Sequence, residues 1–328
     1  MRARPGGCER SSAGAAGLRD VLGQELTAQL AADMHRVAAR TDGTVRPRRQ
    51  SYDHAVTGIY VGISGWTYPA WRGSFYPAGL PQRRELEHAS RQMSSIEING
   101  SFYSLQRPTS YQHWAAQTPE NFVFSVKGGR FITHMKKLAG VDTALSNFFA
   151  SGMLALGAKL GPILWQLPPT LPYHRERLEA FFRILPRTTT QVAALTSGHD
   201  ERMDGRAWTV TDAERPVRHA LEVRHPSYCD PSFLALLRQF QIAVVIADTA
   251  GKWPLFESVT TDFAYVRLHG DEELYVSGYS DAALDTWAQR ILAWAEEAQD
   301  VFVYFDNDVK VRAPFDAMAL AGRLGVGP

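Results

Sequence analysis

Hydrophobic and polar positions follow two alternating rhythms along the chain after Gly58. Short runs of β-branched and aromatic residues, typical of strands, are separated by longer stretches in which apolar residues recur at helical spacing. The eight short runs are Ile59–Ser64, Ser95–Asn99, Phe122–Lys127, Ile163–Leu167, Ala220–His225, Ala243–Asp248, Ala264–His269 and Val301–Asp306. Strands that alternate with helices predict parallel pairing, and eight such strands close the common α/β barrel.

Six of the intervening stretches have the length and pattern of helices. They are Glu85–Met93, Asp142–Leu156, Arg175–Leu185, Pro231–Gln239, Ala282–Ala298 and Pro314–Leu324. The competing architecture, an open doubly wound sheet, usually has a glycine-rich turn after its first strand. Here that turn is the bulky Gly65-Trp66-Thr67-Tyr68. Polar residues also occupy every second position near the strand ends, as in a barrel interior. The sequence therefore predicts an α/β fold, a (β/α)8 TIM-type barrel, over residues 58–328.

Residues 1–57 differ in composition from the rest and predict an N-terminal extension. Arginine, glycine, alanine and serine dominate this stretch, and its nine arginines against six acidic residues give 9 − 6 = +3. Leu18, Leu22, Leu26, Leu30 and Val37 have helical spacing, which suggests a helix over roughly residues 18–40. We expect the remainder of the extension to be disordered and the basic Arg46–Gln50 to be a solvated linker.

Charge and cysteine content narrow the classes of function. The chain has 35 Lys+Arg and 34 Asp+Glu, a net charge of +1. This balance argues against a protein that coats nucleic acid, which needs a visible basic excess, although a local basic pocket remains compatible. Cys8 and Cys229 are far apart and offer no disulfide framework. With no apolar run approaching a membrane span and no signal-peptide pattern, we expect a cytoplasmic protein that is not inserted in a membrane.

Polar side chains gather at the carboxyl ends of the predicted strands, where (β/α)8 barrels have their active sites. They are Glu97, Asn99, Ser125, Lys127, Gln166, Glu222, Arg224, Asp248, Arg267, His269, and, on the last strand, Tyr304, Asp306 and Asp308 on one face with Asn307 on the other. Burying any of these charges unpaired costs several kcal/mol, so we expect them to pair around one polar cavity.

These residues support both structural and catalytic interpretations. Glu97 with Lys127 and Glu222 with Arg224 are candidate salt bridges that hold the barrel. Glu222 beside Arg224 is expected to stay ionised, whereas Glu97 or Asp248 in a drier position is expected to have a raised pKa suited to acid–base work. Aromatic residues favour sugar stacking or, alternatively, packing at the rim. They are Trp66, Tyr68, Trp71, Phe102, Tyr103 and Trp165.

Metal and anion sites are further candidates. His134, His225, His269, Glu222 and Asp248 are metal-ligand types, but they lack the close spacing of known metal motifs, so a divalent metal stays an open alternative. No motif for an organic cofactor occurs. Lys127-Gly128-Gly129-Arg130 can form a nest of backbone N–H groups flanked by cations. Together with Arg224 and Arg267, it suggests a small anionic ligand, and His269 is the histidine expected to face the pocket.

Seven motifs in order resemble the YecE-like family, domain of unknown function 72. They are Gly62–Pro77, Ile96–Tyr103, Phe124–His134, Lys159–Pro169, Leu221–Tyr228, Tyr265–Gly270 and Val303–Asp308. The resemblance covers residues 58–324 and implies a TIM-type barrel without implying a reaction. It also implies a pocket formed by Trp66, Tyr68, Glu97, Asn99, Tyr103, Lys127, His134, Gln166, Glu222, Arg224, His225, Asp248, Arg267, His269 and Asn307.

Three departures from the family pattern stand out. Asp306 replaces a usual Asn, Tyr228 replaces a common Trp, and the longer connection Thr188–Arg218 precedes the fifth strand. The first affects the preferred ligand charge, and the connection is either a lid or a surface excursion.

Three functions fit the sequence. The leading hypothesis is a hydrolase-like enzyme for a small or moderate anionic ligand, with Glu222 or Asp248 as general base and Glu97 as the partner acid. In this hypothesis Lys127, Arg224 and Arg267 hold the anion. The second is a metal-dependent phosphoesterase or endonuclease-like enzyme that uses His269, Glu222 and Asp248 as ligands. The third is a protein that binds a ligand without turning it over.

Overall fold

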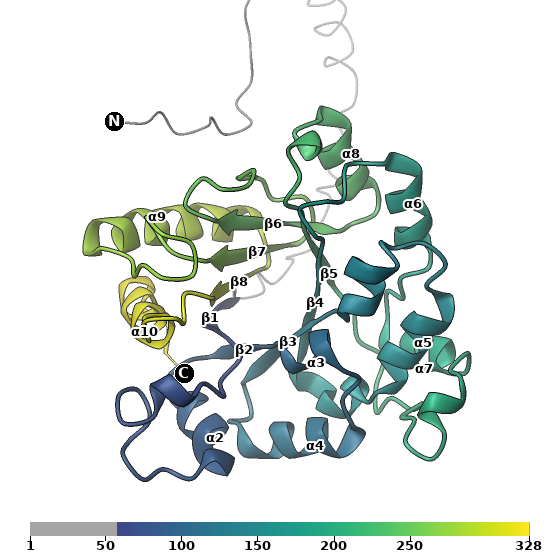
Figure 1. Cartoon of the computed structure of the whole chain (residues 1–328), viewed down its shortest axis with the longest axis horizontal. Coiled ribbons are helices and arrows are strands. Elements are labelled where there is room, and N and C mark those ends of the chain that lie inside the picture. The colour runs from purple at the N-terminus through teal and green to yellow at the C-terminus, as the bar shows by residue number, and fades with distance from the viewer. Residues whose placement is uncertain (1–57, 328) are drawn as a thin grey trace, which may run out of the picture. The chain divides into compact units, whose positions relative to one another are not determined.

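The computed structural model describes residues 58–327, and eight parallel strands in that part of the chain close into a barrel in sequence order (Figure 1). The strands are β1 (Gly58–Ser64), β2 (Ser95–Ile98), β3 (Val123–Lys127), β4 (Leu160–Gln166), β5 (His219–Glu222), β6 (Ala243–Asp248), β7 (Phe263–Leu268) and β8 (Asp300–Phe305). Each overlaps one predicted strand, and β1 pairs with β8 to complete the ring. The predicted TIM-type barrel is confirmed, whereas the predicted N-terminal helix lies outside the described residues.

Helices surround this ring on its outside (Figure 1). They are α2 (Glu85–Ala89), α3 (Gly100–Tyr103), α4 (Pro108–Gln117), α5 (Asp142–Ala150), α6 (Arg175–Arg183), α7 (Thr189–Thr196), α8 (Pro231–Gln239), α9 (Asp281–Glu297) and α10 (Ala313–Leu324). Shorter turns of helix are η1 (Pro69–Trp71), η2 (Gln82–Arg84), η3 (Phe131–Met135), η4 (Met153–Lys159), η5 (Glu201–Met203) and η6 (Pro226–Tyr228). No helix among residues 58–327 is long and apolar enough to cross a membrane.

The helix predicted over Asp142–Leu156 is in fact two elements, α5 and η4. Gly152 separates them with a φ of 115°, which a residue with a side chain rarely adopts. A Cβ at this position would also lie 2.5 Å from Cα of Pro108. The close approach of α4 therefore ends α5, a constraint from distant residues that helical spacing does not reveal.

The long connection before β5 packs on the outside of the barrel. Its helix α7 contacts α5, and Trp208 donates a backbone hydrogen bond to the carbonyl of Ala150 at 2.9 Å. Thr188 and Pro216 form an antiparallel bridge that closes the base of the excursion. These contacts favour the surface excursion over the lid.

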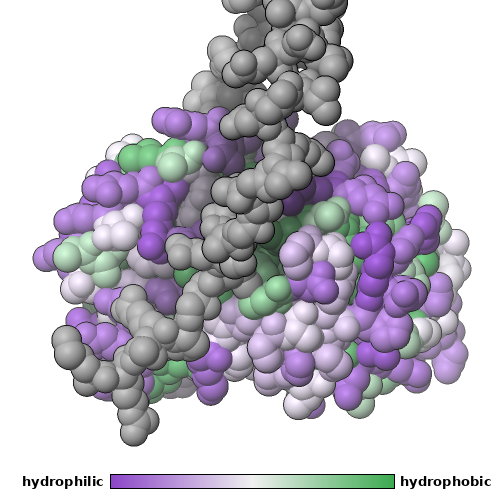
Figure 2. All heavy atoms as spheres, turned by 90° about the horizontal axis from the view of Figure 1, so that it is seen from above, coloured by the Kyte–Doolittle hydropathy of each residue, from purple (hydrophilic) through white to green (hydrophobic). Residues whose placement is uncertain are grey.

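Two packed layers position the strand ends. Between strands and helices lies a large apolar layer that includes Trp165, which is fully buried against Phe148, Phe181 and His219. Trp165 and Trp71 are core residues, so neither is available to stack on a sugar. Most hydrophobic side chains are thus inside, and hydrophilic side chains cover much of the surface seen in Figure 2.

The barrel interior is partly polar at mid-height. The hydroxyl of Tyr265 lies 2.7 Å from Oγ of Ser125, and the hydroxyl of Tyr304 lies 2.7 Å from Oγ of Ser95. All four side chains are buried. These hydrogen bonds satisfy polar groups that would otherwise be costly to bury, and they support the charged residues at the strand ends.

The Gly128-Gly129 pair does not form the expected anion-binding nest. Neither glycine has a positive φ, which the alternating backbone of a nest requires. The N–H of Gly128 instead donates to the carbonyl of Leu164 at 2.8 Å. Glycine is needed there because a Cβ would lie 2.3 Å from the indole ring of Trp165.

This pair of glycines gives a matched test of the packing. Gly128→Ala forces a methyl group into a buried indole and should lower the free energy of unfolding by about 1–3 kcal/mol. At Gly129 the nearest atom to an added Cβ is 3.8 Å away, so Gly129→Ala should change stability little. Chemical denaturation of both variants measures the difference, and equal losses would contradict the close packing of Gly128 on Trp165.

Candidate functional site

Arg267 lies at the centre of the polar mouth, the carboxyl ends of the strands. Its side chain is fully buried and extends from β7. Nε and Nη2 donate to the two oxygens of Glu97 at 3.1 and 2.9 Å, Nη1 donates to Glu222 at 2.7 Å, and Nη2 donates to Asp306 at 2.8 Å. With His269, these residues form what we call the Arg267 cluster. They belong to β2, β5, β7 and the segments just after β7 and β8, so one guanidinium connects distant parts of the ring.

Every N–H of Arg267 is engaged in this cluster. A guanidinium has five N–H donors. Besides the contacts with the three carboxylates, Nη1 donates to Nε2 of His269 at 3.3 Å and Nη2 donates to Oγ of Ser64 at 3.2 Å. Arg267 was expected to hold an anionic ligand. In the structure its donors are all engaged by neighbouring residues and the side chain is shielded from solvent, so Arg267 has no free donor to offer a ligand.

Glu97 is saturated by hydrogen bonds. Besides Arg267, it accepts from Oγ of Ser64 at 3.0 Å and from the hydroxyl of Tyr265 at 2.7 Å. The predicted salt bridge between Glu97 and Lys127 does not form, because the ion-pair partner of Glu97 is Arg267. A carboxylate held by this many donors is better suited to fixing Arg267 than to exchanging protons with a ligand.

Glu222 bridges two arginines. Its Oε1 accepts from Nε of Arg224 at 2.7 Å and forms an ion pair with Nη2 at 2.7 Å, which confirms the expected pair, and its Oε2 accepts from Arg267. Burial acts to raise the pKa of Glu222, but Arg224 and Arg267 outweigh it and hold the pKa well below its ordinary value. Glu222 therefore stays ionised as expected, and it is a weak base.

Asp306 and His269 complete the cluster. Burial acts to raise the pKa of Asp306, but Arg267 and His269 hold it below its ordinary value. Because Arg267 can only donate, Nε2 of His269 must be unprotonated, and the proton lies on Nδ1, 3.1 Å from Asp306 in a poorly aligned contact. Burial and Arg267 lower the pKa of His269, which agrees with this neutral form.

Lys127 is the cation that the cluster leaves without a carboxylate. It lies at the end of β3 with 8% of its surface exposed, and its Nζ is 4.7 Å from the centroid of the Phe102 ring. Nζ makes no hydrogen bond or ion pair with any other described residue. Burial and Arg267 lower the pKa of Lys127. A ligand that brings a negative charge would relieve this destabilisation.

Further polar groups lie at or just beyond the strand ends. Oδ1 of Asn99 is buried and accepts no hydrogen bond from the described residues, while Gln166 is buried at the end of β4. The hydroxyl of Tyr68 donates to the carbonyl of Ser64 at 2.6 Å. Burial and the nearby Asp306 raise the pKa of Asp308 to about 6. Asp308 was noted at its strand end but not included among the predicted site residues.

Aromatic residues that the sequence did not single out border the same region. Arg224 stacks on Trp253 with 4.0 Å between the guanidinium carbon and the ring centroid. The ring of Tyr275 packs edge-on against His269, with centroids 5.2 Å apart. His134 also belongs to this region, since burial, Arg224 and Lys127 lower its pKa to about 4. Trp253 and Tyr275 come from loops after β6 and β7, where strand periodicity gives no signal.

Asp248 and Asn307 turn away from the Arg267 cluster. Oδ2 of Asp248 accepts from the hydroxyl of Tyr279 at 3.1 Å. Burial raises the pKa of Asp248, which agrees with the prediction that either Glu97 or Asp248 has a raised pKa. Nδ2 of Asn307 donates to Asp316 at 2.8 Å and to the carbonyl of Ser277 at 2.9 Å. Asp248 is thus separate from the charged residues that meet at the mouth, which are Glu97, Lys127, Glu222, Arg224, Arg267 and His269.

Three other predicted ligand-binding residues lie at the edge. Trp66 packs edge-on against Trp114, and Tyr103 is 70% exposed beside Phe102. Nδ1 of His225 accepts from the backbone N–H of Ser227 at 3.2 Å, so His225 caps η6. Over residues 58–327 there is no group of three or more His, Cys, Asp or Glu side chains arranged to hold a metal, and His269, Glu222 and Asp248 have the separate partners described above.

Comparison with known proteins gives a family and a set of similar structures. The model of the family described as "Protein of unknown function DUF72" matches residues 60–327. The UPF0759 protein YunF of Bacillus subtilis is 23% identical over 279 residues, which cover 76% of this chain and 89% of YunF. The UPF0759 protein YecE of Escherichia coli K12 is 30% identical over 129 residues, 39% of this chain and 44% of YecE.

Two crystal structures of DUF72 family proteins have the same fold. The protein from Thermotoga maritima superposes with a TM-score of 0.65 at 23% identity, covering 82% of this chain and 99% of its own. The protein from Enterococcus faecalis superposes with a TM-score of 0.61 at 19% identity, covering 84% of this chain and 100% of its own. At these identities the likeness concerns the fold alone.

Removal of the central guanidinium tests the Arg267 cluster. Arg267→Met leaves the buried Glu97 and Glu222 and the partly buried Asp306 without their shared partner, and it should lower the free energy of unfolding by about 3–5 kcal/mol. The control is Arg84→Gln, which removes an exposed pair with Glu87 and should change the free energy of unfolding little, because solvent screens that pair. Urea denaturation at neutral pH measures both variants. A loss at Arg267 no larger than at Arg84 would refute the central role of the cluster.

Proposed function

This chain belongs to the DUF72 family of unknown function, and we propose that it is a hydrolase-like enzyme whose barrel mouth binds a small or moderate anionic ligand through Lys127. With only two cysteines, far apart in the sequence, the chain suits a reducing compartment, and we assign the enzyme to the cytoplasm.

Lys127 supports this proposal because its ammonium group is buried and has no ion-pair partner among the described residues. Arg267 is compensated by Glu97, Glu222 and Asp306, and Arg224 is compensated by Glu222. These pairings occupy the carboxylates of the cluster and leave Lys127 in contact with the ring of Phe102. A buried charge is stable only with a partner, so a bound anion is the natural counterion.

Neutral polar groups around Lys127 suit the rest of such a ligand. Asn99 and Gln166 each have an amide with donors and an acceptor, and the acceptor of Asn99 is unused. Arg224 is held by Glu222 and Trp253, so we propose that it lines the ligand site rather than carrying the anion alone. A phosphate or carboxylate with hydroxyl groups nearby matches this mixture.

Asp308 is the carboxyl group best suited to acid–base chemistry at the mouth. A general base is most effective when its pKa is near the working pH, and the pKa of Asp308 is about 6. We propose that Asp308 takes a proton from water as the water oxygen bonds to phosphorus or carbon, and returns it to the leaving oxygen. Glu97 and Glu222 then act as positioning residues, and neutral His269 keeps Asp306 in place.

A protein that binds the same anion without turnover is the second candidate. It rests on the same Lys127 and differs in needing no acid–base group. Binding of phosphate without hydrolysis of any ester or glycoside would favour it over the enzyme.

Anion binding at Lys127 can be measured by thermal denaturation with phosphate, sulfate, acetate and citrate. An anion at about a hundred times its dissociation constant adds about 2.7 kcal/mol of stability, which raises Tm by about 5–10 °C. Lys127→Gln should remove most of the shift. The control Lys137→Gln makes the same charge change at an exposed lysine and should retain it. If no anion stabilises the wild type, or Lys127→Gln responds fully, the proposed site is wrong.

The pH dependence of hydrolysis tests Asp308. With p-nitrophenyl phosphate and p-nitrophenyl glycosides as substrates, kcat/KM should rise as pH increases through about 6, because the ionised carboxylate is the base. Asp308→Asn should lower the rate by about 10²-fold or more and abolish this limb of the profile. The control is Asp204→Asn on the outer excursion, which should leave the profile unchanged. An unaltered profile in Asp308→Asn would exclude this role.

A further inference from the structure

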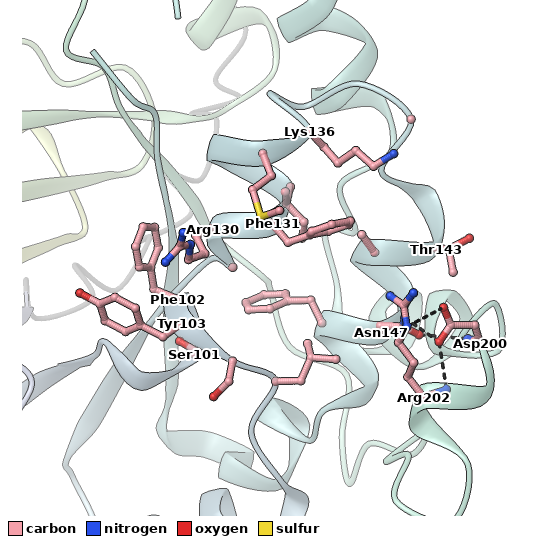
Figure 3. A pocket seen from close by; sticks show the side chains of 18 residues that line it. Ser101, Phe102, Tyr103, Arg130, Phe131, Lys136, Thr143, Asn147, Asp200 and Arg202 are labelled. Atoms are coloured by element: carbon pink, nitrogen blue, oxygen red, sulfur yellow. Dashed lines mark hydrogen bonds and ion pairs between the residues drawn. The ribbon is translucent and has the colours of Figure 1, made fainter. Parts of the chain in front are cut away.

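A cavity lined by Phe102, Arg130 and Phe131 lies beside the mouth, and we call it the lateral cleft. Its volume is about 590 Å³, and it is formed by α3, η3, α5 and the segment around η5 (Figure 3). In Figure 3, Phe102, Tyr103 and Arg130 lie at one end and Asn147, Asp200 and Arg202 at the other, with Phe131 between them. Small-molecule sites commonly have volumes of a few hundred to a thousand Å³. The cleft is therefore large enough for an organic ligand rather than a lone ion.

Apolar side chains in the cleft are unusually exposed to solvent. Tyr103 is 70% exposed, Phe131 41% and Met135 62%, and these are three of the seven large hydrophobic residues exposed in the described chain. Phe102, Ile132 and Phe148 continue the apolar lining. Exposed apolar groups gathered at one concave site indicate a binding surface, since covering them removes unfavourable contact with water.

The charged groups at the rim favour an anion. Arg130 and Lys136 line the cleft, and neither has an ion pair with another residue in the described part of the chain. Lys136 lies over the ring of Phe131, with 5.9 Å between Nζ and the centroid. The single carboxylate of the cleft, Asp200, already accepts from Nδ2 of Asn147 at 2.9 Å and from the backbone N–H of Arg202 at 3.1 Å. Positive charge is thus in excess there.

The π-helical turn η3 separates the lateral cleft from the mouth. In this turn the N–H of Lys136 donates to the carbonyl of Phe131 at 2.9 Å, five residues earlier. His134 packs against Phe102 with centroids 5.1 Å apart, and the charges of Arg224 and Lys127 help to lower its pKa. Phe131 and Met135, in contrast, line the cleft. Single π turns often occur at functional sites because they redirect side chains. Here the turn supplies residues to two neighbouring sites.

We infer that the lateral cleft binds an organic anion with a flat apolar body, such as an aromatic carboxylate, sulfonate or phosphate monoester. The apolar body lies against Phe131, Met135 and Phe102, and the anionic group faces Arg130 and Lys136. Lys127 does not line this cleft, so the site is distinct from the anion site at the mouth. Phe102 contributes to both regions.

Isothermal titration of the full chain with 2-naphthalenesulfonate tests this inference, with neutral 2-naphthalenemethanol as the matched ligand. The double variant Arg130→Gln/Lys136→Gln should weaken sulfonate binding by about tenfold or more, because it removes the charged contacts. Its affinity for the alcohol should change little. The control Arg83→Gln/Arg175→Gln removes the same charge from exposed positions outside the cleft and should bind both ligands like the wild type.

Two further variants separate the cleft from the mouth. Ala144→Phe fills the cleft and should weaken the binding of both ligands. If this variant fails to fold, Met135→Glu places a negative charge at an exposed position of the cleft and should weaken the binding of the sulfonate by repulsion. Lys127→Gln should leave naphthalenesulfonate binding unchanged, so a failed mouth site would not affect this result. The inference is overturned if the wild type does not bind the sulfonate saturably, or if the cleft variants bind it normally. Tighter binding of a short oligodeoxythymidine in the cleft would also overturn it.

Discussion

A single guanidinium inside the barrel is the interaction on which the site depends. Arg267 is fully buried, and an isolated charge in that position would be too costly to retain. Three carboxylates and one imidazole surround it and fix one another by hydrogen bonds. The same pairing fixes the protonation of His269 and keeps Glu222 ionised. It also consumes the nearby negative charge, which is why Lys127 has no carboxylate partner and the mouth favours an anion.

Asp306 shows how one substitution changes this balance. The sequence resemblance implies that Asn is usual at this position. An amide could accept a hydrogen bond from Arg267 but would bring no charge, so the cluster would be one unit more positive. In this chain Asp306 accepts from Arg267 and lies beside Nδ1 of His269. Asp306 therefore affects the preferred charge of a ligand indirectly, because it neutralises part of the charge of Arg267.

The sequence predicted the barrel because two periodicities, of strand and of helix, are local properties of the chain. It also predicted that seven charged groups would meet, since carboxyl ends of parallel strands share one end of a barrel. They are Glu97, Lys127, Glu222, Arg224, Asp248, Arg267 and His269, and of these Asp248 is hydrogen-bonded to Tyr279 instead. It predicted the pair of Glu222 with Arg224, but it assigned Lys127 rather than Arg267 as the partner of Glu97. Glu97 on β2 meets Arg267 on β7, with β1 and β8 between them in the ring. Such a contact depends on rotamers and distances across the interior. The sequence did not predict helix α7, because the threonines at its start have low helical propensity. Its N-terminal cap, the hydrogen bond from the N–H of Gln191 to the hydroxyl of Thr188, is recognised only in the structure.

The pKa of Lys127 reports whether the Arg267 cluster leaves this lysine without a carboxylate partner. The chain has six lysines, so NMR of protein with labelled lysine side chains, compared with Lys127→Gln, can assign the Lys127 signal. Burial without a carboxylate partner predicts that Lys127 titrates below the ordinary value of 10.5, and that a bound anion raises its pKa. A pKa at or above 10.5 in the free protein would contradict this, because it would mean that the Arg267 cluster does not leave Lys127 unpaired.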